Sequence, residues 1–80
     1  MNLEIITPEK KLFSGEVNMV QLPGTKGSFE ILNNHAPIIS TLEKGIIRVK
    51  DKEKEILSLE IQGGVIEAKE NNIIVLAEVE

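Results

Sequence analysis

The chain has 80 residues, of which 41% are hydrophobic and 28% charged, and this ordinary globular balance predicts one small folded domain over residues 1–80. A formal net charge of −4 and only two aromatic residues, both Phe, disfavour nucleic-acid binding, which needs cationic side chains and stacking platforms. The absence of cysteine excludes disulfides, thiolate zinc sites and thiol nucleophiles.

Short apolar runs, each closed by Gly, Pro, Asn or charged residues, follow one another along the chain, and none has the period of a helix. This pattern predicts an all-β protein of many short strands. The expected strands are residues 2–7, 16–22, 28–32, 38–42, 46–50, 55–61, 64–68 and 72–78.

Turn-forming residues separate the expected strands. Pro8 should end the first strand, because proline cannot donate a hydrogen bond within a sheet. The pairs Pro23-Gly24 and Asn33-Asn34 are strong turn signals. Charged hairpin tips are expected at residues 51–54 and 69–72.

Two of the expected strands differ in their polarity pattern. In residues 55–61 every second residue from Leu57 onward is apolar, so one face should point to a core and the other to water. Residues 73–77 are apolar on both faces, as expected for a strand buried between two layers or covered by another subunit. Regularly spaced short strands of both kinds predict a β-sandwich or flattened barrel.

The sequence carries no P-loop, no G-x-G-x-x-G and no G-x-S-x-G nucleophile motif. His35 is the only histidine, and at a turn before Pro37 such a residue more often satisfies local backbone groups than performs catalysis. Gly63-Gly64 favours a tight corner or bulge with positive φ over an anion-binding nest. We therefore expect no catalytic residue, no cofactor and no metal site, and hence no enzyme.

Several segments in register resemble one family. Residues 27–42 (GSFEILNNHAPIISTL) and 45–49 (GIIRV) contain a glycine-led strand, an N-H-A-P turn and a G-x-I-R segment. Residues 12–17 (LFSGEV) resemble an F-S-G-x-V segment, and GGVIEA and VLA near the end resemble G-G-x-x-E-V and V-L-A. This pattern is similar to the β-sandwich domain of the F-type ATP synthase epsilon subunit, whose mitochondrial homologue is called delta.

The resemblance implies a flattened β-sandwich of about ten short, mostly antiparallel strands. It also implies a non-catalytic rotor subunit in the central stalk of a proton-translocating ATP synthase, which binds the gamma subunit and the c-ring and couples rotation to ATP synthesis. Such a subunit lies at the cytoplasmic face of the bacterial inner membrane. Contact with the membrane is expected only through the complex, because the longest apolar run, residues 73–77, is too short to span a bilayer.

The resemblance further nominates contact residues, for which a purely structural role is also open. Those expected to contact the c-ring are Lys26, Gly27, Ser28 and Glu30. Those expected to contact the gamma subunit are Thr7, Pro8, Phe13, His35, Ala36 and Pro37. The family often has Gly at the position of Glu30 and Ser at that of Gln62.

Many relatives continue after the V-L-A segment into two antiparallel helices, which inhibit ATP hydrolysis and in some bacteria bind ATP. This sequence ends at Glu80, so we expect no C-terminal helical hairpin and neither of its functions.

Two other functions stay open. A lipoyl-type carrier domain is also acidic, all-β and of this size, and would bear its acyl group on Lys52 of the Asp51-Lys52 pair. The charged neighbours Lys50, Glu53 and Lys54 instead favour an ordinary solvated turn. A free-standing sandwich that binds peptides along an exposed edge strand would show no affinity for gamma.

Overall fold

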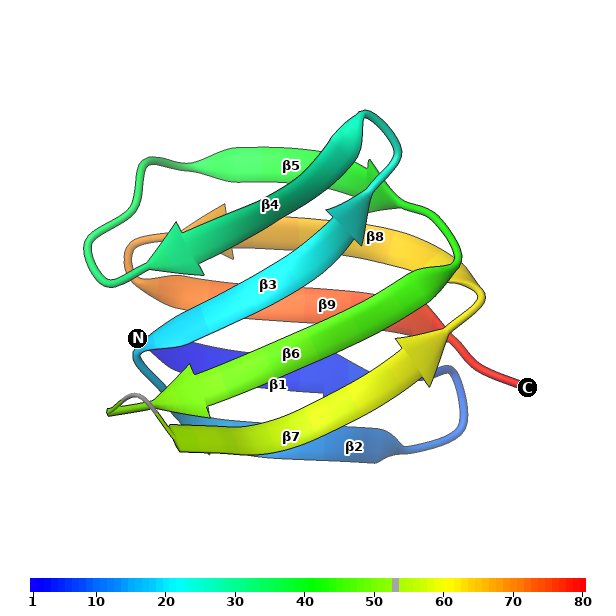
Figure 1. Ribbon diagram of the computed structural model, residues 1–80, viewed down its shortest axis with the longest axis horizontal. Coiled ribbons are helices and arrows are strands. Elements are labelled where there is room, and N and C mark those ends of the chain that lie inside the picture. Colours follow the sequence, from blue (N-terminus) through cyan, green and yellow to red (C-terminus); the bar gives the residue numbers. More distant parts are fainter. Residues whose placement is uncertain (53) are drawn as a thin grey trace.

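A computed structural model describes residues 1–52 and 54–80, and in them the chain forms nine β-strands arranged in two layers (Figure 1). The strands are β1 (Asn2–Ile6), β2 (Lys11–Glu16), β3 (Met19–Gly24), β4 (Gly27–Leu32), β5 (Ile38–Leu42), β6 (Gly45–Asp51), β7 (Lys54–Ile61), β8 (Gly63–Lys69) and β9 (Asn72–Glu78). The described part of the chain contains no helix long and apolar enough to cross a membrane.

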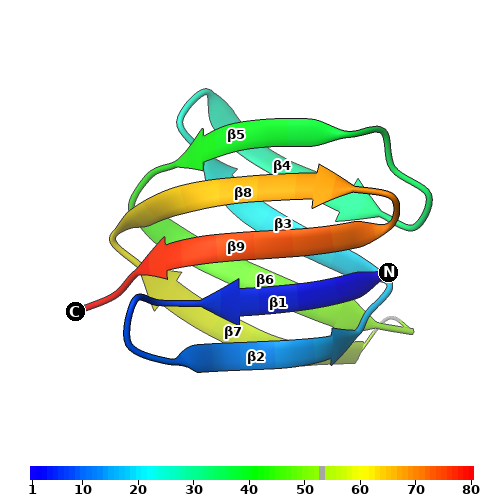
Figure 2. The same ribbon diagram turned by 180° about the vertical axis from the view of Figure 1, so that it is seen from behind.

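One layer contains β2, β1, β9, β8 and β5 side by side, and the other contains β4, β3, β6 and β7 (Figures 1 and 2). The two layers form one continuous curled sheet, because Gly24 at the end of β3 pairs with Leu42 at the end of β5. Among the described strand pairs, β1 and β9 run parallel and the others run antiparallel. The sheet therefore folds over on itself and encloses the core between its inner faces.

The core is built from aliphatic side chains that alternate inward along the strands. It contains Leu3, Ile5, Val20, Leu22, Ile47, Val49, Ile61, Ile66, Ile73 and Val75, each at most 1% exposed. Burial of one such side chain contributes about 1.5–3 kcal/mol to folding. Within the described residues no polar or charged residue is buried as a whole.

The structure confirms an all-β sandwich with mostly antiparallel strands, although the described residues form nine strands rather than about ten. The expected strands 38–42 and 72–78 agree with β5 and β9. The turn at Asn33-Asn34 and the hairpin tip at Glu70 and Asn71 are also present. In the expected tip at residues 51–54, Lys52 has a φ of 52°, and Glu53 lies outside the described residues.

The prediction was wrong around β2 and the start of β3. β2 was not expected, because its sequence contains Ser14 and Gly15 and lacks apolar alternation. It pairs with β1 along one side and forms an edge of its layer, where weak strand formers are tolerated. The expected strand 16–22 is interrupted at Val17 and Asn18, and β3 begins only at Met19.

The turn expected at Pro23-Gly24 was also wrong. Both residues belong to β3, where they pair with Ser28 and Gly27, and the turn consists of Thr25 and Lys26. Pro23 lies beyond the part of β3 that pairs with β6, near the point where the sheet passes from one layer to the other. A residue without an N–H group is tolerated there.

The corner expected at Gly63-Gly64 lies one residue earlier, at Gln62, and both glycines belong to β8, but Gly64 has the expected positive φ, 159°. Gln62 donates its backbone N–H to the carbonyl oxygen of Glu78 at 2.7 Å, which ties this bend to the end of β9.

Candidate interaction surfaces

The β3–β4 turn and the first two residues of β4 carry three of the four residues expected to contact the c-ring, and the turn is held against β5. The Thr25 N–H donates to the carbonyl oxygen of Thr41 at 3.2 Å, and the two threonine hydroxyls lie 3.0 Å apart. Lys26 is exposed at the tip, and Gly27 begins β4 with a φ of 122°, a conformation that favours glycine. The turn is therefore a fixed projection at one end of the sandwich.

A groove of about 670 Å³ lies between this turn and β5. Its lining comprises Gly24, Thr25, Lys26, Gly27, Ser28, Phe29, Ile38, Ile39, Ser40, Thr41 and Val65. The structure thus brings Lys26, Gly27 and Ser28 together, whereas Glu30 lies further along β4 and lines a separate hollow with His35.

The residues expected to contact gamma are divided between the two ends of the molecule. Thr7 and Pro8 follow β1 in the turn to β2 and share a hollow with Val79 and Glu80. His35 lies in the loop of residues 33–37 between β4 and β5, which is at the opposite end (Figure 1). The structure therefore does not gather these residues into one patch.

Two of the residues expected to contact gamma make local contacts. Phe13 is half-buried and packs against the core from β2. The Nδ1 atom of His35 lies 3.1 Å from the carbonyl oxygen of Ala36, an acceptor, so this contact requires a hydrogen on Nδ1. Nε2 is buried and has no hydrogen-bond partner among the described residues.

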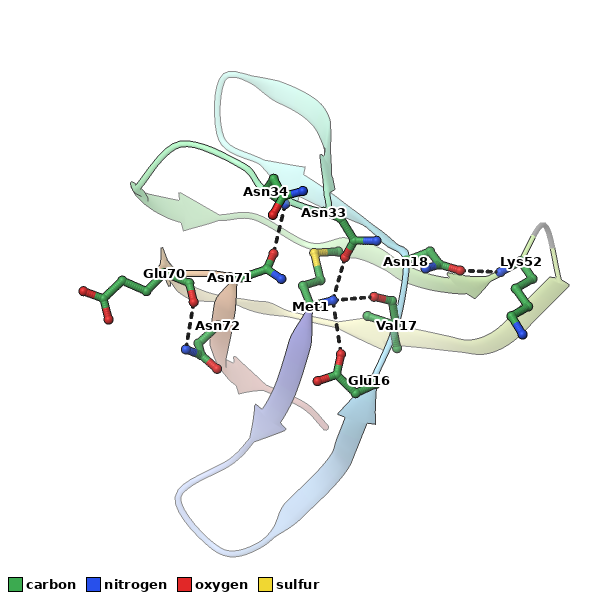
Figure 3. A network of polar contacts seen from close by, with 10 residues as sticks. All are labelled: Met1, Glu16, Val17, Asn18, Asn33, Asn34, Lys52, Glu70, Asn71 and Asn72. Carbon is green, nitrogen blue, oxygen red and sulfur yellow. Dashed lines mark hydrogen bonds and ion pairs between the residues drawn. The ribbon is translucent and has the colours of Figure 1, made fainter.

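The loop of residues 33–37 is fixed to the rest of the sandwich at its first two residues (Figure 3). The side-chain oxygen of Asn33 accepts a hydrogen bond of 2.6 Å from the amino group of Met1. The backbone N–H of Asn34 donates to the side-chain oxygen of Asn71 at 3.0 Å. Asn71 belongs to the β8–β9 hairpin, and its carbonyl oxygen also accepts from the N–H of Asn2.

The outer face of the layer that contains β5, β8 and β9 carries exposed apolar side chains that we call the outer patch: Ile39, Val65, Ile74 and Leu76, with exposures of 74%, 42%, 45% and 44%. Val65 pairs with Leu76 across β8 and β9, while Ile74 and Ile39 flank Glu67 on either side. Sequence reasoning did not identify this surface, although the two-faced apolar pattern of residues 73–77 pointed to half of it.

The burial of the β9 side chains tests the two explanations offered for the apolar pattern of this strand. Ile73, Val75 and Ala77 are buried in the core, but Ile74 and Leu76 are nearly half exposed. Burial of both faces between two layers of this chain was therefore wrong.

The outer face of the other layer is more polar. Arg48 of β6 contacts Glu55 of β7 at 3.3 Å, and the side-chain amide of Gln21 donates to the Ser28 hydroxyl at 3.1 Å. Leu32, Ile46 and Ile56 are exposed apolar residues in this layer, at 58%, 42% and 45%. Around Ile46, however, the cross-strand partner is Glu60, and the next outward residue of β6 is Arg48.

The part of the chain that the structure describes contains no group of three or more His, Asp or Glu side chains suited to a metal ion. Lys52, the candidate acyl carrier, is exposed, and its backbone N–H donates to the Asn18 side chain at 2.7 Å.

Comparison with known families gives a match over nearly the whole chain. The family described as "ATP synthase, Delta/Epsilon chain, beta-sandwich domain" matches residues 1–79. The chain is 42% identical over 78 residues to the ATP synthase epsilon chain of Caulobacter vibrioides, covering 98% of this chain and 90% of that one. It is 40% identical over 78 residues to the epsilon chain of Leptospira borgpetersenii, of which it spans 61% while 98% of this chain is covered.

Solved structures with the same fold come from mitochondrial ATP synthases. A chain of the Euglena gracilis complex (OSCP/F1/c-ring) has a TM-score of 0.86 at 18% identity, covering 94% of this chain and 48% of that one. A chain of the Tetrahymena thermophila central stalk/c-ring structure has a TM-score of 0.81 at 13% identity, covering 96% and 62%. At these identities the likeness concerns the fold.

Proposed function

Since the chain belongs to the ATP synthase delta/epsilon family through its β-sandwich domain, we propose that it is a non-catalytic rotor subunit in the central stalk of a proton-translocating F-type ATP synthase. The observation that carries this proposal is the family match across residues 1–79. The subunit binds gamma and the c-ring and passes rotation to the catalytic subunits. It is held at the cytoplasmic face of the bacterial inner membrane by the complex.

The physical properties of the sandwich support this role. A subunit that transmits torque needs a stiff, preformed binding surface, and a sheet closed over an aliphatic core supplies one. The Lys26 turn, fixed by the Thr25–Thr41 contacts, is our candidate for the c-ring contact with Gly27, Ser28 and Glu30. A gamma subunit that contacts both Pro8 and His35 must extend along the sandwich, whose longest dimension is 29 Å.

Binding to the gamma subunit of the same organism, followed by co-purification and titration, tests the proposal. We expect a one-to-one complex that His35→Glu weakens, while Ser58→Glu on the polar outer face leaves it unchanged. No complex with a folded gamma subunit would contradict the proposal. A lipoyl adduct on Lys52 in the intact mass would favour the carrier-domain alternative.

A further inference from the structure

The amino group of Met1 is enclosed by three oxygen acceptors (Figure 3). It donates to the carbonyl oxygen of Val17 at 3.0 Å and to the side-chain oxygen of Asn33 at 2.6 Å. It also lies 3.2 Å from a carboxylate oxygen of Glu16. An ammonium group has three hydrogens, so each hydrogen can be directed to one of these oxygens. The site therefore suits a cation with three donors.

Backbone pairing fixes the position of this amino group. The N–H of Val17 donates to the carbonyl oxygen of Met1 at 2.9 Å, so the two residues are bonded in both directions. They extend the pairing of β1 with β2 beyond Asn2 and Glu16. Met1 is 5% exposed, and its side chain belongs to the core. Because the amino group cannot turn towards water unless Met1 leaves both the sheet and the core, it is closed in when the chain folds.

Acylation would change the chemistry of this amino group. Bacterial ribosomes start chains with N-formylmethionine, and a formyl or acetyl amide carries no charge and a single N–H. That N–H can serve only one of the three oxygens, while the added carbonyl group brings a fourth acceptor among them. Two oxygens would lose their donor, and Glu16 would lose its ion pair. An acylated Met1 therefore fits poorly in the folded chain.

We propose that the fold requires the free α-ammonium group of Met1, so that the formyl group is removed before β1 pairs with β2. Hydrolysis by a deformylase breaks the bond between the formyl carbon and the nitrogen. Water supplies the second oxygen of the released formate, and the nitrogen takes up a proton to become the ammonium group. After folding, the amino group is protected from acylating enzymes and reagents. This inference is independent of the proposed function.

The thermal stability of the formylated chain tests the inference. The chain is produced in a bacterial host with and without a deformylase inhibitor, and intact mass distinguishes the two forms. We expect the Tm of the formylated chain to be lower by at least about 4 °C. Lys44→Gln is the control, because it removes one positive charge at an exposed residue and should shift Tm by less than about 2 °C. An equal Tm for the formylated and free chains would overturn the inference.

Should the formylated chain fail to fold, it is unfolded in urea, treated with purified deformylase and refolded. Recovery of the Tm of the free chain supports the inference, and failure to recover it after complete deformylation overturns it.

A second measurement checks the enclosure of the amino group in the free chain. Acetic anhydride is added to the folded chain and to the chain in urea, and peptide mass spectrometry identifies the acetylated amines. We expect Met1 to react at least about tenfold more slowly in the folded chain, and exposed Lys44 to change by less than about threefold. Equal protection factors for Met1 and Lys44 would contradict the proposed enclosure.

Discussion

Gly64 of β8 occupies a position that has no space for a side chain. A Cβ atom at this position would collide with the carbonyl oxygen of Leu76, which belongs to the backbone of β9. The collision cannot be relieved by turning a side chain, so β8 and β9 would have to separate locally. The glycine is required for close strand approach.

We therefore expect Gly64→Ala to lower the free energy of unfolding by about 1–3 kcal/mol, measured by chemical denaturation. Gly15→Ala is the control, because its Cβ would meet the Phe13 ring at 3.5 Å, an ordinary contact. Equal losses of stability in the two variants would show that the approach of β9 to Gly64 is not the cause.

Among the strands, short apolar runs closed by Gly, Pro, Asn or charged residues predicted most of the elements. β5 and β9 were found with their observed bounds. β2 was missed because an edge strand with Ser14 and Gly15 carries little apolar signal. Pro23-Gly24 was taken for a turn because Pro-Gly is a strong local turn signal, whereas both residues are held in β3 by pairing with Ser28 and Gly27 of β4.

The β8–β9 hairpin has a second role, which is to hold the loop of residues 33–37 through Asn71. Asn71→Gly keeps the left-handed backbone, with its φ of 61°, but removes the oxygen that accepts from the Asn34 N–H at 3.0 Å. We expect faster hydrogen exchange at the Asn34 amide and a loss of about 0.5–1.5 kcal/mol in stability.

The control for this element is Asn71→Asp, which keeps an acceptor oxygen at the same place and should retain slow exchange at Asn34. NMR-detected exchange of that amide is the measurement. Fast exchange in both variants would mean that the Asn71 oxygen does not hold the loop.

At the scale of the whole molecule, the sequence predicted the fold class and, by resemblance, the family. It could not predict which surfaces form, because these depend on pairings such as β1 with β9 and β3 with β5. Residues 26–28 are close in the chain and remain close in space. The residues expected to contact gamma included two segments that the fold places at opposite ends of the molecule.

The outer patch illustrates the same limit. Ile74 and Leu76 could be suspected from the two-faced pattern of β9, but Ile39 and Val65 join them only through the register of β5, β8 and β9. An exposed apolar patch assembled from three strands is therefore information that tertiary structure adds.

The central claim is that this chain couples rotation to ion movement in an ATP synthase. The most direct test is to replace the native epsilon-type subunit of a bacterial host with this chain and its own gamma subunit, and to record ATP-driven proton uptake by inverted membrane vesicles. We expect proton uptake to be restored with this chain and its gamma subunit, and to be absent from vesicles that lack this chain. ATP hydrolysis without proton uptake, with the unmodified chain folded and bound in the complex, would contradict the claim.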